Sequence, residues 1–492
     1  MGSIDIVKVA IVLCLCVTVG TCHAREGKHL RYGKGGGRHH LSSEGLTSKS
    51  EKSHGHHKPP PKGHSPPKPP SPPAPTPAPL GSKNSTVFNV LDFGAKGDGH
   101  SDDSKAFLAA WAAACKVEAS TVLIPSGSDF LVNPVSFTGP DCKPDIVFQL
   151  DGKIIAPTSS SAWRKGILHW IEFTKLSRMT ITGKGIMDGR GSVWWNDVAS
   201  YNLDQEDRTN SSLGLVVDAE LDKMPNTKPT ALQFYGSDQV TVTGITIQNS
   251  PQMHLTFDAC TNLIVFGIQI SSPGDSPNTD GIHLHNSQNV LIHDVDLACG
   301  DDCISIQTGS SSIYIHDVNC GPGHGISIGG LGKDNTQACV SNVTVRNAAI
   351  SNAMTGVRIK TWQGASGSAQ NIIFSNIQVS EVQTPIMIDQ YYCDHAKCKN
   401  QTSAMAVSGI TYGDIRGTYT VQPVRLACSD SVPCTGISLS SIQLKPVHST
   451  HHLYNALCWN AHGEVKTDTN PPLIDCLSKG NPAKVPSKIS SC

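Results

Sequence analysis

Residues 290–297 read Val290-Leu-Ile-His-Asp-Val-Asp-Leu297, and residues 313–319 read Ile313-Tyr-Ile-His-Asp-Val-Asn319. Similar short, β-branched pieces recur along the chain, with starts about 22 to 38 residues apart and turns rather than helices between them. The pieces start at Val240, Leu263, Val290, Ile313, Val343 and Ile372, with later copies near Ile410 and Ile437. Leucine-rich repeats need a tighter leucine frame, and β-propellers need four strands in each longer unit. We therefore predict an all-β fold, a right-handed parallel β-helix in which each coil buries its apolar face against its neighbours.

A second strand of each coil is indicated by four segments with one shared pattern. These are Asp280-Gly-Ile-His-Leu, Asp302-Cys-Ile-Ser-Ile, His324-Gly-Ile-Ser-Ile and Thr355-Gly-Val-Arg-Ile, whose first residues are 22, 22 and 31 positions apart. Equivalent residues of stacked parallel strands lie roughly 4.8 Å apart. We therefore expect Asp280, Asp302 and His324 in one column, with Asp301 beside Asp302. The outward positions of the next coil carry two cations, Arg358 and Lys360.

This stripe of charge suits the hydrolysis of a glycoside. Three neighbouring aspartates repel one another, so at least one should have a raised pKa. Hydrolysis needs one protonated carboxyl for the leaving oxygen and one ionised carboxylate to activate water or to attack. An Asp/Asn ladder or a turn motif is the structural alternative. The chain has only 16% charged residues, against roughly 25% in an average soluble protein, so clustering beside two cations favours a functional site.

Four motifs at these positions resemble those of the polygalacturonases, the pectin-hydrolysing family of glycosidases. They are Asn278-Thr-Asp280-Gly, Gly300-Asp-Asp302, Gly323-His-Gly325 and Arg358-Ile-Lys360. Gly185-Ile-Met-Asp-Gly-Arg-Gly-Ser-Val-Trp-Trp is also similar to plant members of that family. The resemblance extends over residues 87–492. It implies inverting hydrolysis of α-1,4-galacturonosyl linkages in homogalacturonan, with no metal and no other cofactor.

The resemblance also implies roles for the catalytic residues. Asp301 is expected to be the general acid, while Asp280 and Asp302 hold and deprotonate the attacking water. Inversion requires the acid and base to be far enough apart for a water molecule between them. His324 is expected to tune the proton of the acid or to orient the substrate.

The same resemblance implies a substrate-binding set. Arg358 and Lys360 match residues that bind substrate carboxylates, and charge-assisted hydrogen bonds suit galacturonate. Asn278 is expected to shape the site. Tyr392 resembles a tyrosine that contacts substrate, although the adjacent Tyr391 competes for that assignment.

Several alternatives remain open from the sequence. Endo action on demethylated homogalacturonan is our preferred interpretation, and exo action or a different pectic polymer, such as rhamnogalacturonan or xylogalacturonan, is the alternative within the hydrolases. Clustered aspartates also bind calcium, so a pectate lyase with the same fold is a rival. A non-catalytic wall-binding protein is a further rival, from a different functional class.

The chain divides into three segments. Residues 1–24 resemble a secretory signal peptide, because Lys8 precedes an apolar run at 9–19 and small residues follow, including Ala24; the run is short for a membrane anchor. Residues 25–83 are rich in His, Lys and Pro and are expected to be disordered, either as a wall-interacting arm or as a pro-segment that is cleaved or merely tethers the domain. Residues 84–492 are expected to form the catalytic domain, whose folded part begins near Val87.

Composition limits the partners and the location. The formal net charge of −1 argues against nucleic-acid binding, and no later segment approaches the length of a membrane span. We expect a secreted monomer that acts on pectin in the cell wall.

Secretion also determines how the cysteines and sequons are interpreted. An even number of cysteines remains after the presumed signal, which favours disulfides. Zinc binding is the competing interpretation, but the sequence has no pair of C-x-x-C motifs to supply the ligands. The local bridges expected are Cys393–Cys398, Cys428–Cys434 and Cys476–Cys492. Glycosylation is expected at the sequons Asn84, Asn210, Asn342 and Asn400.

The sequence predicts one notable helix, near the start of the domain. It runs from Ser104 to about Lys116 and is capped by Asp102 or Asp103. Its apolar side comprises Ala106, Phe107, Ala110, Trp111 and Ala114. A helix before a long run of strands is expected to cover the open end of the solenoid.

Overall fold

The computed structural model describes residues 85–163, 166–195, 224–394, 398, 400–447 and 453–479. These residues belong to one compact unit. The expected signal peptide, the His- and Pro-rich segment, and the sequons Asn84 and Asn210 lie outside the described residues. Within the described part, no helix is both long enough and apolar enough to cross a membrane.

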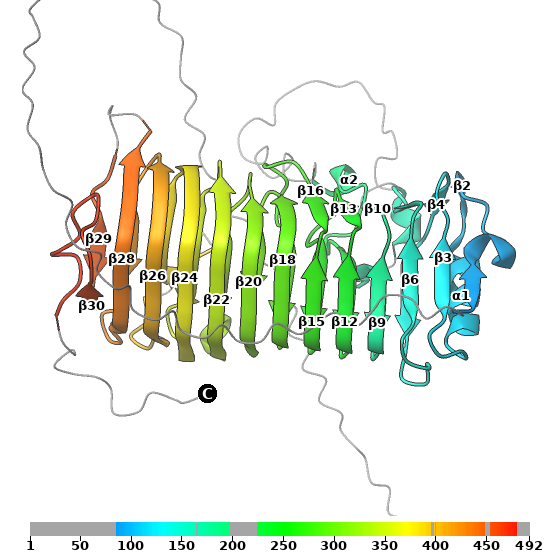
Figure 1. Cartoon of the computed structure of the whole chain (residues 1–492), viewed down its shortest axis with the longest axis horizontal. Coiled ribbons are helices and arrows are strands. Elements are labelled where there is room, and N and C mark those ends of the chain that lie inside the picture. Colours follow the sequence, from blue (N-terminus) through cyan, green and yellow to red (C-terminus); the bar gives the residue numbers. More distant parts are fainter. Residues whose placement is uncertain are drawn as a thin grey trace, which may run out of the picture. The chain divides into compact units, whose positions relative to one another are not determined.

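Two parallel sheets wind through the unit (Figure 1). The first sheet, sheet A, contains β1 (Val87–Asn89), β2 (Asp98–Asp102), β3 (Thr121–Ile124), β4 (Asp129–Leu131), β6 (Val147–Leu150), β7 (Lys153–Ile155), β9 (Ser177–Thr182), β10 (Ile186–Asp188), β12 (Asp238–Thr243), β13 (Thr246–Gln248), β15 (Thr261–Phe266), β16 (Gln269–Ser271), β18 (Gln288–Ala298), β20 (Ser310–Cys320), β22 (Gln337–Ser351), β24 (Ser366–Val382), β26 (Ala406–Tyr419), β28 (Cys434–Pro446) and β30 (Ala461–Val465). Its early coils carry two short strands each, and these merge into single long strands from β18 onward.

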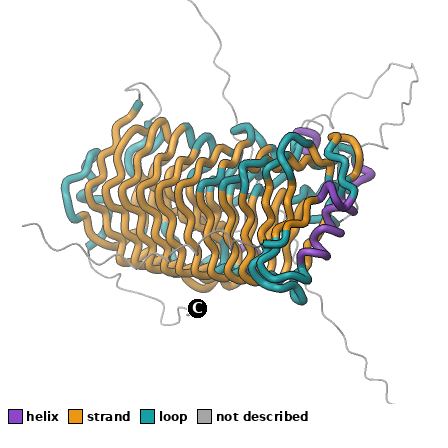
Figure 2. The backbone as a smooth tube through the Cα atoms, turned by 45° about the vertical axis from the view of Figure 1, so that its right-hand side comes forward, coloured by secondary structure: helices purple, strands orange, loops and turns teal. Residues whose placement is uncertain are grey.

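The second sheet, sheet B, contributes one strand to each coil. It contains β5 (Val135–Thr138), β8 (His169–Thr174), β11 (Thr230–Tyr235), β14 (Leu255–Asp258), β17 (Ile282–His285), β19 (Ile304–Ile306), β21 (Ile326–Leu331), β23 (Thr355–Trp362), β25 (Thr384–Tyr392), β27 (Val424–Ala427) and β29 (Leu457–Trp459). Each strand between the two ends of the sheet pairs in parallel with the strands of the coils before and after it. The coils stack in sequence order, as the colours of Figure 1 show, and Figure 2 shows the successive turns of the backbone side by side. The predicted parallel β-helix is confirmed.

The repeat predicted from sequence appears as a column of sheet A. Val240 lies beside Met179 on one side, and the register continues from Leu263 to Val290, Ile313, Val343, Ile372 and Ile410. All of these side chains are buried. Each repeat thus starts at the same place in its coil, because an inward apolar residue must stack on the equivalent residue of the next coil.

Inside sheet B, aromatic rings form a ladder at the early coils. Phe137, Phe173, Phe234 and Phe257 are fully buried, and their rings stack at 4.9, 5.3 and 5.1 Å between successive centroids. Leu284 continues this inward column on β17. Side chains alternate along a strand, so the neighbouring positions of sheet B point outward, and the functional residues are among them.

The helices are few and short in the described part of the chain. They are α1 (Ser104–Ala114), α2 (Ser192–Trp195), and the 3-10 turns η1 (Val90–Phe93), η2 (Ser160–Ala162) and η4 (Lys333–Asn335). The predicted apolar side of α1 is buried, and α1 lies over the N-terminal end of the solenoid (Figure 1). Asp102 accepts the N–H of Ser104, whereas the carboxylate of Asp103 accepts the N–H groups of Lys96 and Gly97 instead of capping the helix.

Two of the three predicted disulfides are confirmed, Cys393–Cys398 and Cys428–Cys434. The third prediction is wrong, because Cys476 is bonded to Cys458 and not to Cys492. Cys458 lies in β29, so this bridge ties the segment after β30 back onto sheet B. The described part also contains the bridges Cys115–Cys142 and Cys303–Cys320. Of the sequons, Asn342 and Asn400 are exposed, which keeps glycosylation there as a prediction.

Candidate active site

The candidate site lies on the outer face of sheet B. Ile282, Ile304 and Ile326 are register partners in β17, β19 and β21. Two residues before each isoleucine, in the turn that leads into the strand, lie Asp280, Asp302 and His324. The structure therefore places these three residues in the column that the spacing predicted, and it brings Asp301 next to them. Asp280, Asp301 and Asp302 are called the carboxyl cluster below.

The motif glycines allow the backbone to pack closely around these residues. A Cβ atom at Gly300 would collide with the carbonyl oxygen of Ser276, and one at Gly325 would collide with the carbonyl oxygens of Thr355 and Gly356. Gly325 also has a φ of +83°, which L side chains rarely adopt. These glycines are thus required where Asp301, Asp302 and His324 leave the turn and enter their strands.

Asp302 is paired with both cations of the next coils. Its Oδ1 accepts hydrogen bonds from Arg358 Nη2 at 2.6 Å and from Ser327 Oγ at 2.7 Å, and its Oδ2 accepts one from Lys360 Nζ at 2.8 Å. All four side chains are buried. Ser327 also accepts a hydrogen bond from Arg358 Nε at 3.0 Å, which fixes the guanidinium. The cations thus form one network with a single carboxylate.

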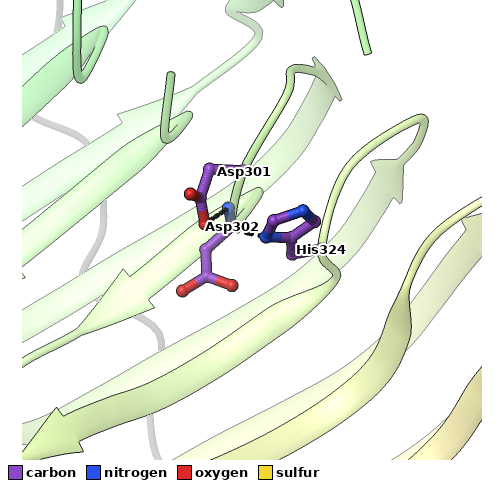
Figure 3. A group of neighbouring side chains, drawn as sticks. All are labelled: Asp301, Asp302 and His324. Atoms are coloured by element: carbon purple, nitrogen blue, oxygen red, sulfur yellow. Dashed lines mark hydrogen bonds and ion pairs between the residues drawn. The ribbon is translucent and has the colours of Figure 1, made fainter. Parts of the chain in front are cut away.

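Asp301 pairs instead with His324, as Figure 3 shows. The distance between His324 Nδ1 and Asp301 Oδ1 is 3.0 Å, and the same oxygen accepts the N–H of Asp302 at 2.8 Å. Asn278 Nδ2 lies 3.4 Å from Oδ2 of Asp301, which places it at the edge of the cluster. His324 is therefore positioned to influence the proton of Asp301.

Asp280 interacts with two histidines that the sequence interpretation did not assign. Its Oδ2 lies 3.3 Å from Nδ1 of His283, and its backbone oxygen lies 2.8 Å from Nδ1 of His254. His254 is completely buried, and its Nε2 lies 2.7 Å from Oγ of Ser272. Burial lowers the pKa of His254 to about 4, so the ring is neutral and holds the backbone of Asp280 in place.

The surroundings give the three carboxyls different affinities for a proton. Burial, followed by the charge of Asp301, raises the pKa of Asp280 to about 6. Burial opposes ionisation of Asp301 as well, but the hydrogen bond and charge of His324 outweigh it and hold its pKa well below the ordinary value. Burial of Asp302 is likewise outweighed by Lys360 and Arg358, which lower its pKa. In the unliganded protein, the cluster therefore holds its first proton on Asp280.

An aromatic wall borders the cations. The Nζ of Lys360 lies 5.3 Å from the ring centroid of Tyr392, within cation–π range. Trp362 packs edge-on against Tyr392, with ring centroids 5.4 Å apart. The side chain of Tyr391 lies away from these cations and hydrogen-bonds with Asp430. Of the two competing tyrosines, Tyr392 is therefore the one next to the candidate site.

Three residues of the site were missed from the sequence: His254, His283 and Ser327. A signal existed for two of them, because His283 and Ser327 occupy the same outward column as Arg358. Their positions within the four aligned segments could have identified them. His254 gave no such signal, since it is buried and lies outside those segments.

Asp301, Asp302 and His324 could also be considered as metal ligands. They offer ligand atoms that all lie within 4.8 Å of one another. Both oxygens of Asp302 already accept hydrogen bonds from Arg358 and Lys360. Two buried cations this close oppose a third positive charge, so the residues fit an anionic ligand better than a metal ion.

Comparisons with known proteins give one consistent result. The family described as "Glycosyl hydrolases family 28" matches residues 115–461. A polygalacturonase from Chamaecyparis obtusa is 42% identical over 363 residues, which cover 73% of this chain and 67% of that protein. A polygalacturonase from Malus domestica is 41% identical over 367 residues, covering 74% and 75%. The solved structure of a polygalacturonase from Erwinia carotovora ssp. carotovora has a TM-score of 0.60 at 22% identity, covering 78% of this chain and 98% of that one, and supports the fold.

Proposed function

The chain belongs to glycosyl hydrolases family 28, and from that premise we propose that it cuts homogalacturonan internally, by inversion, with Asp301 as general acid. The chain is a pectin-degrading glycosidase of the polygalacturonase class. Asp280 and Asp302 act on the attacking water in this proposal. His324 adjusts the proton of Asp301, and Arg358 and Lys360 receive the carboxylate of a galacturonate unit.

The observation that carries the proposal is the separation of proton affinities within the carboxyl cluster. Acid–base catalysis needs one protonated carboxyl and one ionised carboxylate close to each other. The raised pKa of Asp280, at about 6, beside the lowered pKa values of Asp301 and Asp302, provides one shared proton in the mildly acidic range. A purely structural ladder would not require two buried cations to balance it.

Asp301 must hold that proton when the bond breaks, although Asp280 holds it in the unliganded protein. Lys360 and Arg358 contribute to the low pKa of Asp301. A substrate carboxylate that pairs with them neutralises part of their charge, so the pKa of Asp301 rises as substrate binds. Substrate binding thus moves the proton from Asp280 towards Asp301, where the leaving oxygen needs it.

Substrate class, cutting pattern and location complete the proposal. Arg358 and Lys360 favour an acidic polymer such as demethylated homogalacturonan over a neutral one. In this proposal Tyr392, beside Lys360, and Asn278, beside Asp301, contact the substrate. We propose that residues 1–24 direct secretion, that residues 25–83 tether the domain of residues 84–492 in the wall, and that the enzyme acts there as a monomer without a cofactor.

The proposal is tested by reducing-end release from polygalacturonic acid, with the secreted full chain assayed in the presence and absence of EDTA. We expect EDTA-resistant release that Asp301→Asn abolishes while the circular dichroism spectrum is unchanged. Asp317→Asn is a matched control, because Asp317 pairs with His316 at 2.6 Å on sheet A, away from the cluster. Proton magnetic resonance of the first product gives the anomer and hence tests inversion.

The rival functions give different results in the same assay. A calcium-dependent lyase would release unsaturated, ultraviolet-absorbing ends, and EDTA would stop it. A binding protein would retain polygalacturonate without releasing any ends. An exo enzyme would release short products from the start, whereas the proposed endo enzyme lowers the viscosity early.

A further inference from the structure

A second depression lies on the outer face of sheet B, away from the carboxyl cluster. It is a cavity of about 370 Å³ lined by Tyr391, Arg425, Ala427, Asp430, Leu457 and Trp459. None of these residues takes part in the catalytic network described above. The cavity lies on β25, β27 and β29, towards the C-terminal end of the solenoid.

The cavity continues the two outward columns that carry the site cations. Arg358 lies beside Met387, and Met387 lies beside Arg425. In the neighbouring column, Lys360 is followed by Asp389, Ala427 and Trp459. Arg425 is thus two coils from Arg358, or roughly 10 Å along the sheet. That distance is on the scale of a disaccharide, so one extended sugar chain can reach both arginines.

Arg425 is available for an anionic ligand. It is half-buried, and among the residues that the structure describes its side chain makes no hydrogen bond and no ion pair. The nearby carboxylate of Asp430 is used by other donors: Trp459 Nε1 donates to it at 2.7 Å, and Tyr391 also hydrogen-bonds with it. The guanidinium therefore keeps its charge and its donors for a ligand.

Trp459 provides an apolar surface beside this charge. Its side chain is 54% exposed, which is unusual for a large hydrophobic residue. The hydrogen bond to Asp430 fixes the indole, so little conformational entropy is lost when a ligand packs against it. A cation beside a fixed aromatic plane matches a sugar acid, which has a carboxylate and an apolar ring face.

We propose that this cavity is a distal subsite for a galacturonate unit of the polymer that the active site cuts. Arg425 binds the carboxylate of that unit, and Trp459 packs against its pyranose ring. This inference rests on the proposed function, because it needs a galacturonan chain to extend along sheet B from the carboxyl cluster. The subsite makes the enzyme prefer long chains over short ones.

The test compares tri- and hexagalacturonate as substrates for the wild type, Arg425→Gln and Trp459→Ala. We expect each substitution to raise KM for the hexamer about five- to tenfold, as the loss of a charge-assisted bond implies, with kcat and the trimer kinetics unchanged. Higher salt should reduce the effect of Arg425→Gln. Arg416→Gln is the matched control, since Arg416 is exposed on sheet A and pairs with Asp414.

Calorimetric binding of hexagalacturonate to Asp301→Asn, with and without Arg425→Gln, separates this inference from the proposed hydrolysis. Arg425-dependent binding by a wild type that cuts nothing would overturn the hydrolysis and support the subsite. Normal cutting with an unchanged hexamer KM in Arg425→Gln would overturn the subsite alone. An equal rise in KM for the trimer and the hexamer in Arg425→Gln would also overturn the subsite, because Arg425 would then act at the carboxyl cluster. Failure of the protein to bind the hexamer at all would overturn both the subsite and the proposed hydrolysis.

Discussion

The Nζ atom of Lys360 lies 2.8 Å from Oδ2 of Asp302, and both side chains are buried. Arg358 binds the other oxygen of the same carboxylate at 2.6 Å. Two cations thus share one hydrogen-bonded anion, and they also lower the pKa of the nearby Asp301. In the proposed mechanism they receive a second carboxylate, which a galacturonate unit supplies.

Replacing Lys360 by Met should affect both stability and substrate binding. The buried Oδ2 of Asp302 would lose its partner, which costs about 1–3 kcal/mol in the free energy of unfolding. The KM for polygalacturonate should rise at least tenfold. Urea denaturation and initial rates at pH 5 measure these effects, and Lys445→Met on an exposed position of β28 should change stability by less than about 0.5 kcal/mol. A Lys360→Met protein as stable as the wild type would show that the ion pair is not needed to hold Asp302.

The fold was predictable because its repeat is set by one physical requirement. Each coil must place an apolar residue on the same inward column, so Val290, Ile313 and Val343 identify the register directly. The order of Asp280, Asp302 and His324 then follows from the spacing of the second strand. The partner of Cys476 was not predictable, since it depends on how the segment after β30 returns to β29, and sequence proximity says nothing about that path.

The network of the site was predictable only in part. The spacing put Arg358 two coils beyond Asp302, which suggests separate roles. The long side chain of Arg358 instead reaches back across β21 and bonds to both Ser327 and Asp302. Side-chain reach of this kind depends on rotamers and burial, which strand periodicity does not determine. The same limit explains why His254, buried behind Asp280, was missed.

Asp280 should make the protein less stable as the pH rises. Its folded-state pKa is about 6, above the ordinary value of 3.8, so the folded protein binds more protons than the unfolded chain between these values. The contribution to stability is present below about pH 4 and is lost as pH rises through about 6. The Asp280→Asn variant cannot ionise at this position and so avoids this loss of stability. We expect its free energy of unfolding to exceed that of the wild type by about 3 kcal/mol at most at pH 8, and to equal it at pH 4.

Asp302 gives the matched comparison for that experiment. Its pKa is lowered in the folded state, so its stabilisation is present above about pH 4 and is lost as pH falls through the folded-state value. Asp302→Asn should therefore be less stable than the wild type at pH 8. Urea denaturation of Asp280→Asn and Asp302→Asn at pH 4 and pH 8 gives the change in the free energy of unfolding for each variant. A change of the same sign at pH 8 in both variants would contradict the different environments assigned to the two carboxyls.

Tyr412 should tolerate, and even favour, removal of its hydroxyl. The side chain is fully buried and stacks on Phe374 with ring centroids 5.3 Å apart, and its hydroxyl has no hydrogen-bond partner among the described residues. A buried hydroxyl without a partner is unfavourable by about 1–2 kcal/mol. Tyr412→Phe should raise the free energy of unfolding by that amount without changing kcat, whereas Phe374→Tyr should lower it. A destabilised Tyr412→Phe would indicate a hydroxyl partner, such as a buried water.

The pH dependence of kcat/KM should report the proton that the carboxyl cluster shares. In the proposed mechanism, catalysis needs that proton on Asp301, while the unliganded protein holds it on Asp280. The active form is then the singly protonated cluster, whichever residue holds the proton. The proton is lost above the pKa of Asp280, at about 6, and kcat/KM should therefore fall about tenfold per pH unit above that value. The upper limb of kcat should lie at higher pH than that of kcat/KM, because a bound carboxylate neutralises Arg358 and Lys360 and raises the pKa of Asp301. Initial rates at constant ionic strength from pH 3 to pH 9 measure both limbs, with Asp317→Asn as the control. If kcat/KM stayed constant up to pH 8, the shared proton and the role of Asp301 would both be wrong.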